Sequence, residues 1–352
     1  MNRSYQSFLF NFSASYGGGG LKRLMAYSSW FNKHGGASFI VNPRQDGINK
    51  QFPENKYFFL RQSRFTRPIY FSNQLKNFIE DAGAIDLYYS YGIPIPRKVG
   101  RVNWFHLNNV TPLKKDIAPT PLKRRLEMRL LGVLINNCLK YADVISAESE
   151  TSIGLFDKLL SQKLVVSVNG SDDEISAYEN GIGDGGNRDE EDIAVAVGTY
   201  YYKCIDDVYK VYSHLLKSNP SLRLIIIGVR EYIPSNVLKD PRVLTMGVLS
   251  QSEVCDLLRR SKYYITSTVL ENSYNAASEG AFLAREYFIS DIGPHRELLK
   301  GAKFERLDSL STRVACLHGT YADLDPRNLK SWDRVIGEMV DLVHTRLGCL
   351  HP

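Results

Sequence analysis

The chain has 352 residues, of which 43% are hydrophobic and 23% are charged, and its formal net charge is +6. This length predicts about two globular domains, and no run approaches the roughly 20 apolar residues that a membrane-spanning helix needs. The five cysteines lie far apart and form no C-x-x-C pair. That pattern argues against a disulfide framework or a zinc site and indicates a reducing, cytoplasmic compartment. The positive charge favours an anionic partner without naming it.

The first part of the chain alternates short apolar segments with amphipathic ones. We expect strands at 8–12, 38–41, 86–90, 101–105, 144–147 and 164–168, and a first helix from Leu21. Strands that alternate with helices pair in parallel through right-handed crossovers. Residues 1–170 are therefore predicted to form an N-terminal, Rossmann-like domain.

The pattern breaks at residues 171–192, a glycine- and acid-rich segment that cannot build a core and is predicted to be an exposed linker. A second series of strands and helices fills 193–330, and 331–352 holds an amphipathic final helix, which we expect to pack back on the first domain. The predicted fold class is α/β, with two doubly wound, Rossmann-like domains facing a cleft. Ligands of open α/β sheets bind in such places.

A run of four glycines, Gly17–Gly20, separates the first strand from the first helix. Glycines there let the backbone approach a ligand, and a helix start offers free N–H groups to an anion. The third small residue of a dinucleotide fingerprint would fall on Lys22 or Arg23, and no G-x-x-x-x-G-K-[ST] occurs, so standard NAD and ATP loops are disfavoured. A plain tight turn is the alternative to ligand approach.

Two glutamates, Glu271 and Glu279, stand in a segment that leaves an apolar strand and enters a helix. Ser273 is predicted to cap that helix, so that the N–H groups of Asn275–Ala277 point out of its start, where a phosphate is stabilised. A carboxylate can accept hydrogen bonds from two vicinal hydroxyls of a sugar. The alternative is a glutamate favoured by the helix dipole plus an unrelated surface acid.

The spacing of these glutamates resembles the E-x7-E motif of retaining, GT-B-fold glycosyltransferases of family 4. Other pieces of this sequence match the family in order or type: Val197-Gly198 with Lys203 soon after, the segments 224–228 and 243–248, Asn169-Gly170 and the glycine run. The resemblance spans most of the chain and is strongest from about 193 to 300. It implies transfer of a sugar from a nucleotide-sugar donor, and it says little about which sugar.

The resemblance also implies roles for individual residues. Glu279 would hold the donor ribose and Glu271 the transferred sugar, with His106, expected just after a strand and facing the cleft, orienting a sugar hydroxyl. Lys203 would neutralise the leaving diphosphate. The diphosphate would also meet backbone amides, which are those of Asn275, Ala276, Ala277 and either Gly18 or Gly19. No metal and no cofactor beyond the donor is then required.

One position departs from the family. An arginine commonly follows the Val-Gly pair, and here that residue is Thr199, which carries no charge. Arg230, after the strand at 224–228, is expected to supply the missing cation. The alternative is a weakened site.

A basic, amphipathic stretch around residues 121–131 includes Lys123, Arg124 and Arg125. Such a helix can lie on an anionic membrane surface. The alternative is a core-packing helix with a solvated basic face. The 21 tyrosines are scattered and not interleaved with this run, so nucleic acid is not an expected partner.

We therefore predict a retaining, metal-independent glycosyltransferase of surface-polysaccharide assembly, such as O-antigen or capsule. Its acceptor would be a lipid-linked saccharide or oligosaccharide bound by the first domain, at the inner face of the plasma membrane. A sugar-nucleotide epimerase is a second hypothesis, although the first domain lacks a convincing extra pair of carboxylates. A third, prompted by Thr199, is an inactive partner that binds nucleotide sugars.

Overall fold

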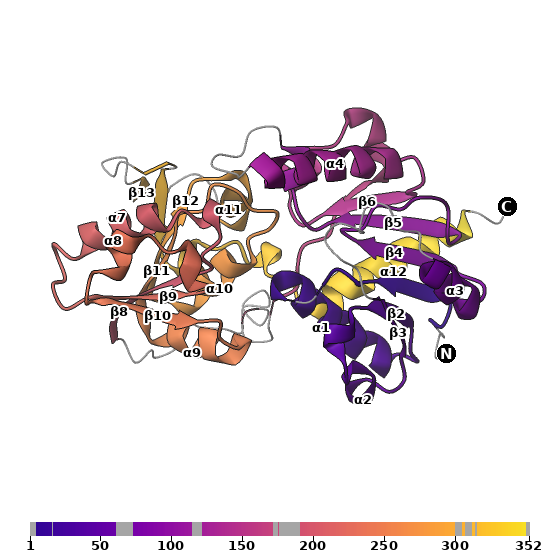
Figure 1. The fold of residues 1–352 in the computed structure, drawn as a ribbon, viewed down its shortest axis with the longest axis horizontal. Coiled ribbons are helices and arrows are strands. Elements are labelled where there is room, and N and C mark those ends of the chain that lie inside the picture. The colour runs from indigo at the N-terminus through magenta and orange to yellow at the C-terminus, as the bar shows by residue number, and fades with distance from the viewer. Residues whose placement is uncertain are drawn as a thin grey trace. The chain divides into compact units, whose positions relative to one another are not determined.

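The computed structural model describes residues 5–15, 17–60, 73–114, 122–171, 175, 191–299, 305–306, 312–313 and 315–349. These residues form two compact units (Figure 1). The first unit holds the described residues of Met1–Lys115, Pro121–Gly170 and Ser331–Pro352, and the second holds those of Ser171–Lys330.

The first unit is built on a parallel sheet. Its strands are β1 (Phe8–Asn11), β2 (Ser38–Val41), β3 (Lys56–Phe59), β4 (Leu87–Tyr91), β5 (Val102–Leu107), β6 (Val144–Ala147) and β7 (Leu164–Val166). Their order in the sheet is β3-β2-β1-β4-β5-β6-β7, and every neighbouring pair is parallel. The chain winds outward in one direction from β1 and in the other from β4, so the carboxyl ends of these two strands mark the point where ligands bind in such sheets.

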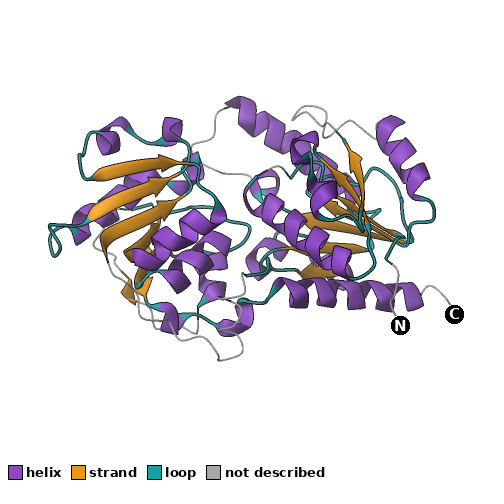
Figure 2. Cartoon of the chain, turned by 90° about the horizontal axis from the view of Figure 1, so that it is seen from below, coloured by secondary structure: helices purple, strands orange, loops and turns teal. Residues whose placement is uncertain are grey.

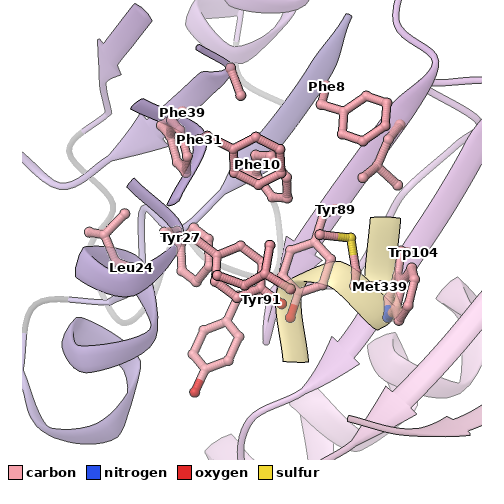
Figure 3. Close-up of a cluster of buried hydrophobic side chains, with 14 of the residues drawn as sticks. Phe8, Phe10, Leu24, Tyr27, Phe31, Phe39, Tyr89, Tyr91, Trp104 and Met339 are labelled. Atoms are coloured by element: carbon pink, nitrogen blue, oxygen red, sulfur yellow. The ribbon is translucent and has the colours of Figure 1, made fainter. Parts of the chain in front are cut away.

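Helices cover this sheet, and the last one comes from the end of the chain (Figures 1 and 2). They are α1 (Gly18–Lys33), α2 (Ile48–Gln51), α3 (Asn73–Ala82), α4 (Leu122–Cys138), α5 (Glu150–Ile153) and α12 (Trp332–Gly348). In Figure 3 Met339 of α12 lies among Tyr89, Trp104 and Phe10 in the buried core. Residues from both ends of the chain therefore share one core.

The second unit repeats the architecture with an antiparallel edge. Its strands are β8 (Glu191–Val197), β9 (Arg223–Ile227), β10 (Val243–Gly247), β11 (Ser261–Thr266), β12 (Glu286–Ser290), β13 (Glu305–Arg306) and β14 (Cys316–Gly319). Their order is β10-β9-β8-β11-β12-β14-β13; pairing is parallel from β10 to β12 and antiparallel around β14. The helices are α7 (Ile205–Leu215), α8 (Ser235–Leu238), α9 (Gln251–Arg260), α10 (Asn275–Leu283) and α11 (Gly293–Leu298).

The predicted α/β class with two doubly wound sheets is confirmed, while several predicted boundaries are wrong. The strand expected at 101–105 is β5, which runs to Leu107 because all six of its residues are buried, so His106 lies inside a strand. Helix α1 begins at Gly18 and not at Leu21, so the glycines form its first turn.

The predicted linker, 171–192, also has a different end. Strand β8 begins at Glu191, where Arg260 donates to the Glu191 carboxylate at 2.8 Å and Ser221 donates to Asp192. Arg260 thus pairs with one acid and Ser221 hydrogen-bonds the other, although the sequence assigned both acids to a solvated segment. Apart from Ser171 and Ile175, the rest of the predicted linker lies outside the described residues. No helix among the described residues is long and apolar enough to cross a membrane.

Candidate functional site

An ion pair lies at the carboxyl edge of the second sheet. Lys203 ends the short 3-10 helix η4 (Tyr201–Lys203), which follows β8, and Glu271 lies in the loop after β11. Lys203 Nζ donates to Glu271 Oε1 at 2.5 Å, and the two side chains are 11% and 20% exposed. Both groups are therefore largely desolvated but remain within reach of a ligand. The structure thus brings together two residues that are 68 positions apart in the sequence.

Backbone contacts between the two loops hold this pair in place. The carbonyl oxygen of Tyr202 accepts from the N–H of Val269 at 2.9 Å and from the hydroxyl of Thr268 at 3.2 Å. Cys204, directly after Lys203, has a φ of 48°, and it is the one non-glycine residue of the described chain with a positive φ. Such strained conformations persist where surrounding contacts fix them, and they cluster at functional sites.

The turn after β8 has no room for larger side chains. Gly198 has a φ of +88°, and a Cβ placed there would lie 3.2 Å from Lys203 Cε, so glycine lets the lysine stem pack against the backbone. Thr199, found where the family commonly has arginine, is buried, and its hydroxyl donates to the Val229 carbonyl at 2.8 Å. Its role is to tie the ends of β8 and β9 together. Arg230, the residue predicted to supply charge, is exposed at the start of the 3-10 helix η5 (Arg230–Tyr232).

Helix α10 begins at Asn275, as expected, but its cap differs from the prediction. The N-cap is Tyr274, which makes no side-chain capping bond; its hydroxyl instead donates to the Asn328 carbonyl at 3.2 Å. Ser273, predicted as the cap, accepts only a long bond of 3.5 Å from the Asn275 N–H. Asn275, Ala276 and Ala277 therefore form a first turn in which the N-cap residue supplies no side-chain bond and only the Asn275 amide has a long one from Ser273.

The charges of Glu271 and Glu279 both affect the pKa of one buried tyrosine, Tyr264. Tyr264 of β11 is fully buried, and its hydroxyl makes no hydrogen bond within the described chain. Burial raises the pKa of Tyr264, and the charges of Glu271 and Glu279 raise it further. Both carboxylates therefore act electrostatically on the same side chain.

His295, near the start of α11, was not predicted from the sequence. It is buried, and its Nδ1 lies 2.8 Å from the Ser290 carbonyl oxygen, which can only accept. The Nδ1 atom must carry the proton, which leaves Nε2 as an acceptor in the neutral ring. Burial lowers the pKa of His295 to about 4, while the charge of Glu271 raises it and that of Lys203 lowers it. Only its place after β12, a strand the sequence analysis did not find, could have signalled it.

In the first unit, Gly18 and Gly19 are exposed in the first turn of α1, whose N-cap, Gly17, makes no side-chain bond. A Cβ at Gly20 would lie 3.1 Å from both Ser15 Oγ and Tyr91 Cε1, so this turn packs tightly on the end of β4. A contact of these amides with an anion stays a prediction.

His106 does not face outward as the sequence suggested; it is fully buried within β5. Its Nδ1 lies 2.8 Å from Ser146 Oγ, and its Nε2 lies 3.5 Å from Glu148 Oε1. Burial lowers the pKa of His106 to about 4, so the ring is neutral at pH 7. The reason for the error is that β5 continues past residue 105 and turns this side chain into the unit's polar core.

Arg23, assigned no role from the sequence, is also buried in this polar core. It donates to the carbonyl oxygens of Ser167 and Val168 at 2.9 and 2.8 Å, and to Asn169 Oδ1 at 3.0 Å. An arginine presents five donors in a rigid fork, which suits the closing of a chain turn. Arg23 therefore anchors the segment in which the chain leaves the first unit.

Helix α4 carries the predicted basic residues together with an apolar stripe. Lys123 and Arg125 are exposed, and Arg124 donates to Glu127 at 3.0 Å. Four large side chains on this helix are each more than half exposed, and they are Leu122, Leu126, Leu130 and Val133. Their spacing puts them on one face, opposite the buried Met128, Gly132 and Ile135.

The second unit thus offers an ammonium, two carboxylates and an uncapped helix start at one edge of its sheet. An ammonium and free amides bind an anion, and carboxylates accept hydrogen bonds from hydroxyls. Among the described residues, no group of three or more His, Cys, Asp or Glu side chains is arranged to hold a metal ion.

No protein-family model matches the chain, and no curated protein is significantly similar to it in sequence. Solved structures do match. WaaG, a glycosyltransferase involved in lipopolysaccharide biosynthesis, has a TM-score of 0.57 at 12% identity, covering 82% of each chain. Anabaena Alr3699/HepE in complex with UDP has a TM-score of 0.54 at 13% identity, covering 84% of this chain and 83% of that one.

An α,α-trehalose-phosphate synthase (UDP-forming) from Burkholderia xenovorans, in complex with glucose-6-phosphate, has a TM-score of 0.52 at 9% identity, covering 84% of this chain and 88% of that one. At such identities the likeness concerns the fold, and it agrees with the two doubly wound sheets described above. The chain therefore has the GT-B fold, two Rossmann-like α/β units in one polypeptide.

Proposed function

We propose that this protein is a retaining glycosyltransferase that moves a sugar from a nucleotide-sugar donor onto a saccharide acceptor. The observation that carries the proposal is the Lys203–Glu271 ion pair, held at the carboxyl edge of a doubly wound sheet next to the uncapped start of α10. This arrangement suits a ligand that joins a diphosphate to a sugar. The GT-B fold supports the same conclusion.

In the proposed reaction an acceptor hydroxyl oxygen bonds to the anomeric carbon of the sugar while the bond from that carbon to the diphosphate breaks. Negative charge grows on the departing diphosphate, which takes up the proton of the acceptor hydroxyl. Lys203 and the amides of Asn275–Ala277 stabilise that charge, and Arg230 adds a second cation. Glu271 binds the transferred sugar, and Glu279 binds the ribose. These groups stabilise the larger negative charge of the transition state more than they stabilise the charge of the bound donor. They therefore accelerate the chemical step. Such a site works without a metal ion.

The first unit contributes two further features to the proposal. The amides of Gly18 and Gly19 are a second candidate for contact with phosphate. Helix α4 combines an apolar stripe with basic side chains, a combination that suits an anionic membrane surface and hence a lipid-linked acceptor of surface-polysaccharide or O-antigen type. Because His106 is fully buried, the proposal gives it no direct contact with a sugar.

The function is tested by incubating the protein with a panel of nucleotide sugars and with lipid-linked and oligosaccharide acceptors. Free nucleotide together with an extended acceptor, with the anomeric configuration of the donor kept, supports the proposal. An altered sugar on an intact nucleotide supports the epimerase instead, and tight binding without turnover supports an inactive partner. Addition of EDTA should leave the rate unchanged, and Glu279→Gln should weaken donor binding sharply.

Membrane association is tested by co-sedimentation with vesicles that contain anionic lipid. A variant with Leu126→Ser and Leu130→Ser, and another with Lys123, Arg124 and Arg125 changed to Glu, should each release the protein, because both the apolar and the electrostatic attraction contribute to binding. A matched variant with exposed Lys50, Lys140 and Lys217 changed to Glu should remain bound. Equal binding by all of these variants would remove α4 from the proposal.

A further inference from the structure

Two tyrosine rings stand exposed at the carboxyl edge of the second sheet. Tyr200 follows β8 and is 53% exposed, and Tyr232 ends η5, after the neighbouring strand β9, and is 44% exposed. Their ring centroids are 6.0 Å apart, with planes inclined at 45°. We call these two residues the tyrosine pair. Neither ring belongs to the buried core of this unit, so its packing does not explain them.

The tyrosine pair is fixed by its neighbours. Tyr202 stacks on Tyr200 with ring centroids 5.8 Å apart and planes only 16° from parallel. The Tyr202 carbonyl also accepts the two bonds from Thr268 and Val269 that hold the Glu271 loop. Tyr200 therefore rests on a support that is anchored to the candidate site.

The order of strands sets the order of side chains along the edge. The sheet runs β9, β8, β11, so Tyr232 comes first, then Tyr200 with Lys203, and then Glu271. The N–H of Lys203 donates to the Tyr200 carbonyl at 2.8 Å, so a single turn of chain joins the ring to the ammonium. Aromatic surface, cation and carboxylate thus follow one another in the order in which a nucleoside diphosphate sugar presents its base, its phosphates and its sugar.

We propose that the tyrosine pair stacks against the nucleobase of the donor. This inference rests on the proposed function and names the part of the donor that the sequence left open. Stacking accepts any base, since every base has a π-face. The tyrosine pair therefore holds the base, and hydrogen bonds from other residues select which base is bound.

The experiment measures the affinity of the full chain for UDP, GDP, ADP and inorganic pyrophosphate by calorimetry, and records the loss of nucleotide absorbance that accompanies stacking. The variants are Tyr200→Ala/Tyr232→Ala, Tyr200→Phe/Tyr232→Phe, and Leu244→Ala as a control on an exposed apolar side chain of β10. Melting temperatures check that each variant is folded.

The double alanine variant should bind the preferred nucleotide roughly 5- to 100-fold more weakly, as expected from losing a stacked base, and should abolish the absorbance change. The double phenylalanine variant, which keeps both rings, and Leu244→Ala should behave like the unchanged protein. Affinity for pyrophosphate, which has no base, should stay the same in every variant.

Two results would overturn the inference while leaving the proposed function intact. One is nucleotide binding by the alanine variant that equals the unchanged protein, and the other is an equal loss of pyrophosphate affinity, which would put the effect on the phosphates. If the alanine variant binds UDP normally but transfers sugar poorly, the rings contact a sugar and not the base. Failure of the unchanged protein to bind any nucleoside diphosphate would instead defeat the proposed function itself.

Discussion

The Lys203 ammonium is paired with Glu271 and can also bind a phosphate. Its ammonium is mostly desolvated, and Glu271 balances it, so the lysine keeps one position without an extended network. A phosphate that approaches this edge competes with the glutamate for the same cation. The charge on a departing diphosphate is larger than on the bound donor, so the lysine gains most in the transition state.

We therefore expect Lys203→Met to lower kcat about 100- to 1000-fold, the usual cost of losing one group that stabilises developing charge, with a smaller change in KM. Lys203→Arg, which keeps the charge, should recover a large part of the rate. Initial rates across donor concentrations measure both quantities. A rise in KM with kcat unchanged would mean that Lys203 only helps to bind the donor.

Two buried histidines make stability depend on pH. Burial lowers the pKa of His106 and of His295 to about 4, whereas the unfolded value is about 6.5. Between these values the unfolded chain binds protons that the folded rings refuse, so stability is full above pH 6.5 and falls as the pH drops toward 4. Each ring can account for at most about 3.4 kcal/mol.

Urea unfolding at pH 7, 6 and 5 should show this loss. His106→Gln and His295→Gln should each reduce the slope of stability against pH by up to about 1.4 kcal/mol per unit, the value for one proton. His106 belongs to the first unit and His295 to the second, so the effects of the two substitutions should add. A slope that neither substitution alters would assign the pH dependence to other groups.

At the scale of elements, helix α10 packs closely on strand β11 because residue 280 is a glycine. A Cβ at Gly280 would lie 2.3 Å from Cγ of the buried Tyr264 ring, a contact that the ring cannot relieve by moving its far end. Gly280→Ala should therefore push α10 off β11, cost about 1–3 kcal/mol as other overpacked cores do, and lower activity through Glu271 and Glu279. Thermal unfolding and donor binding measure the two effects.

Gly337, in α12, is the matched control. A Cβ there meets nothing within 4 Å, so Gly337→Ala should raise stability by about 0.5–1 kcal/mol, the normal gain in a helix interior. If both alanine variants were equally stable, the close approach of α10 to β11 would not be what requires glycine at position 280.

The sequence was informative wherever a single segment determined its own structure. The strand at 144–147 and the final helix from Trp332 follow from apolar spacing and occur as expected. Strands β3 and β14 were not found: β3 has partly exposed positions, and β14 exists through antiparallel pairing with β12, which no local pattern reveals. The ends of β5 and β8 moved because contacts from distant residues extend them.

The site residues also differ in whether one segment of the sequence was enough to predict them. Glu271, Glu279 and the helix start at Asn275 share one segment, so their spacing could be recognised. Lys203 was named from its place in a motif, but its pairing with Glu271 depends on loops that meet through Tyr202. His106 was expected to face a cleft, and burial contradicts that. All six residues of β5 are buried, so the strand has no exposed face whose pattern could have distinguished a buried histidine from an accessible one.

At the scale of the whole molecule, the chain closes its first unit with its last helix. The second unit is one continuous stretch of the described chain, Ser171 to Lys330, whereas the first needs residues from both ends. Trp332 packs against Gly170, where an added Cβ would meet its ring at 2.4 Å, and the Ser171 N–H donates to the Lys330 carbonyl at 2.8 Å. The outgoing and returning segments are therefore fixed side by side.

This topology makes the first unit sensitive to changes near the end of the chain. Met339 is buried in the same cluster as Phe10, Tyr89 and Trp104, so Met339→Ala should cost about 2–5 kcal/mol, the usual result of emptying a core position. Hydrogen exchange followed by mass spectrometry should then speed up in β1, β4 and β5, about 230 to 330 residues away in sequence, and stay unchanged in β8 to β12. Faster exchange confined to α12 would show that the helix merely covers a core that is complete without it, and equal acceleration in both units would show that the two fold as one.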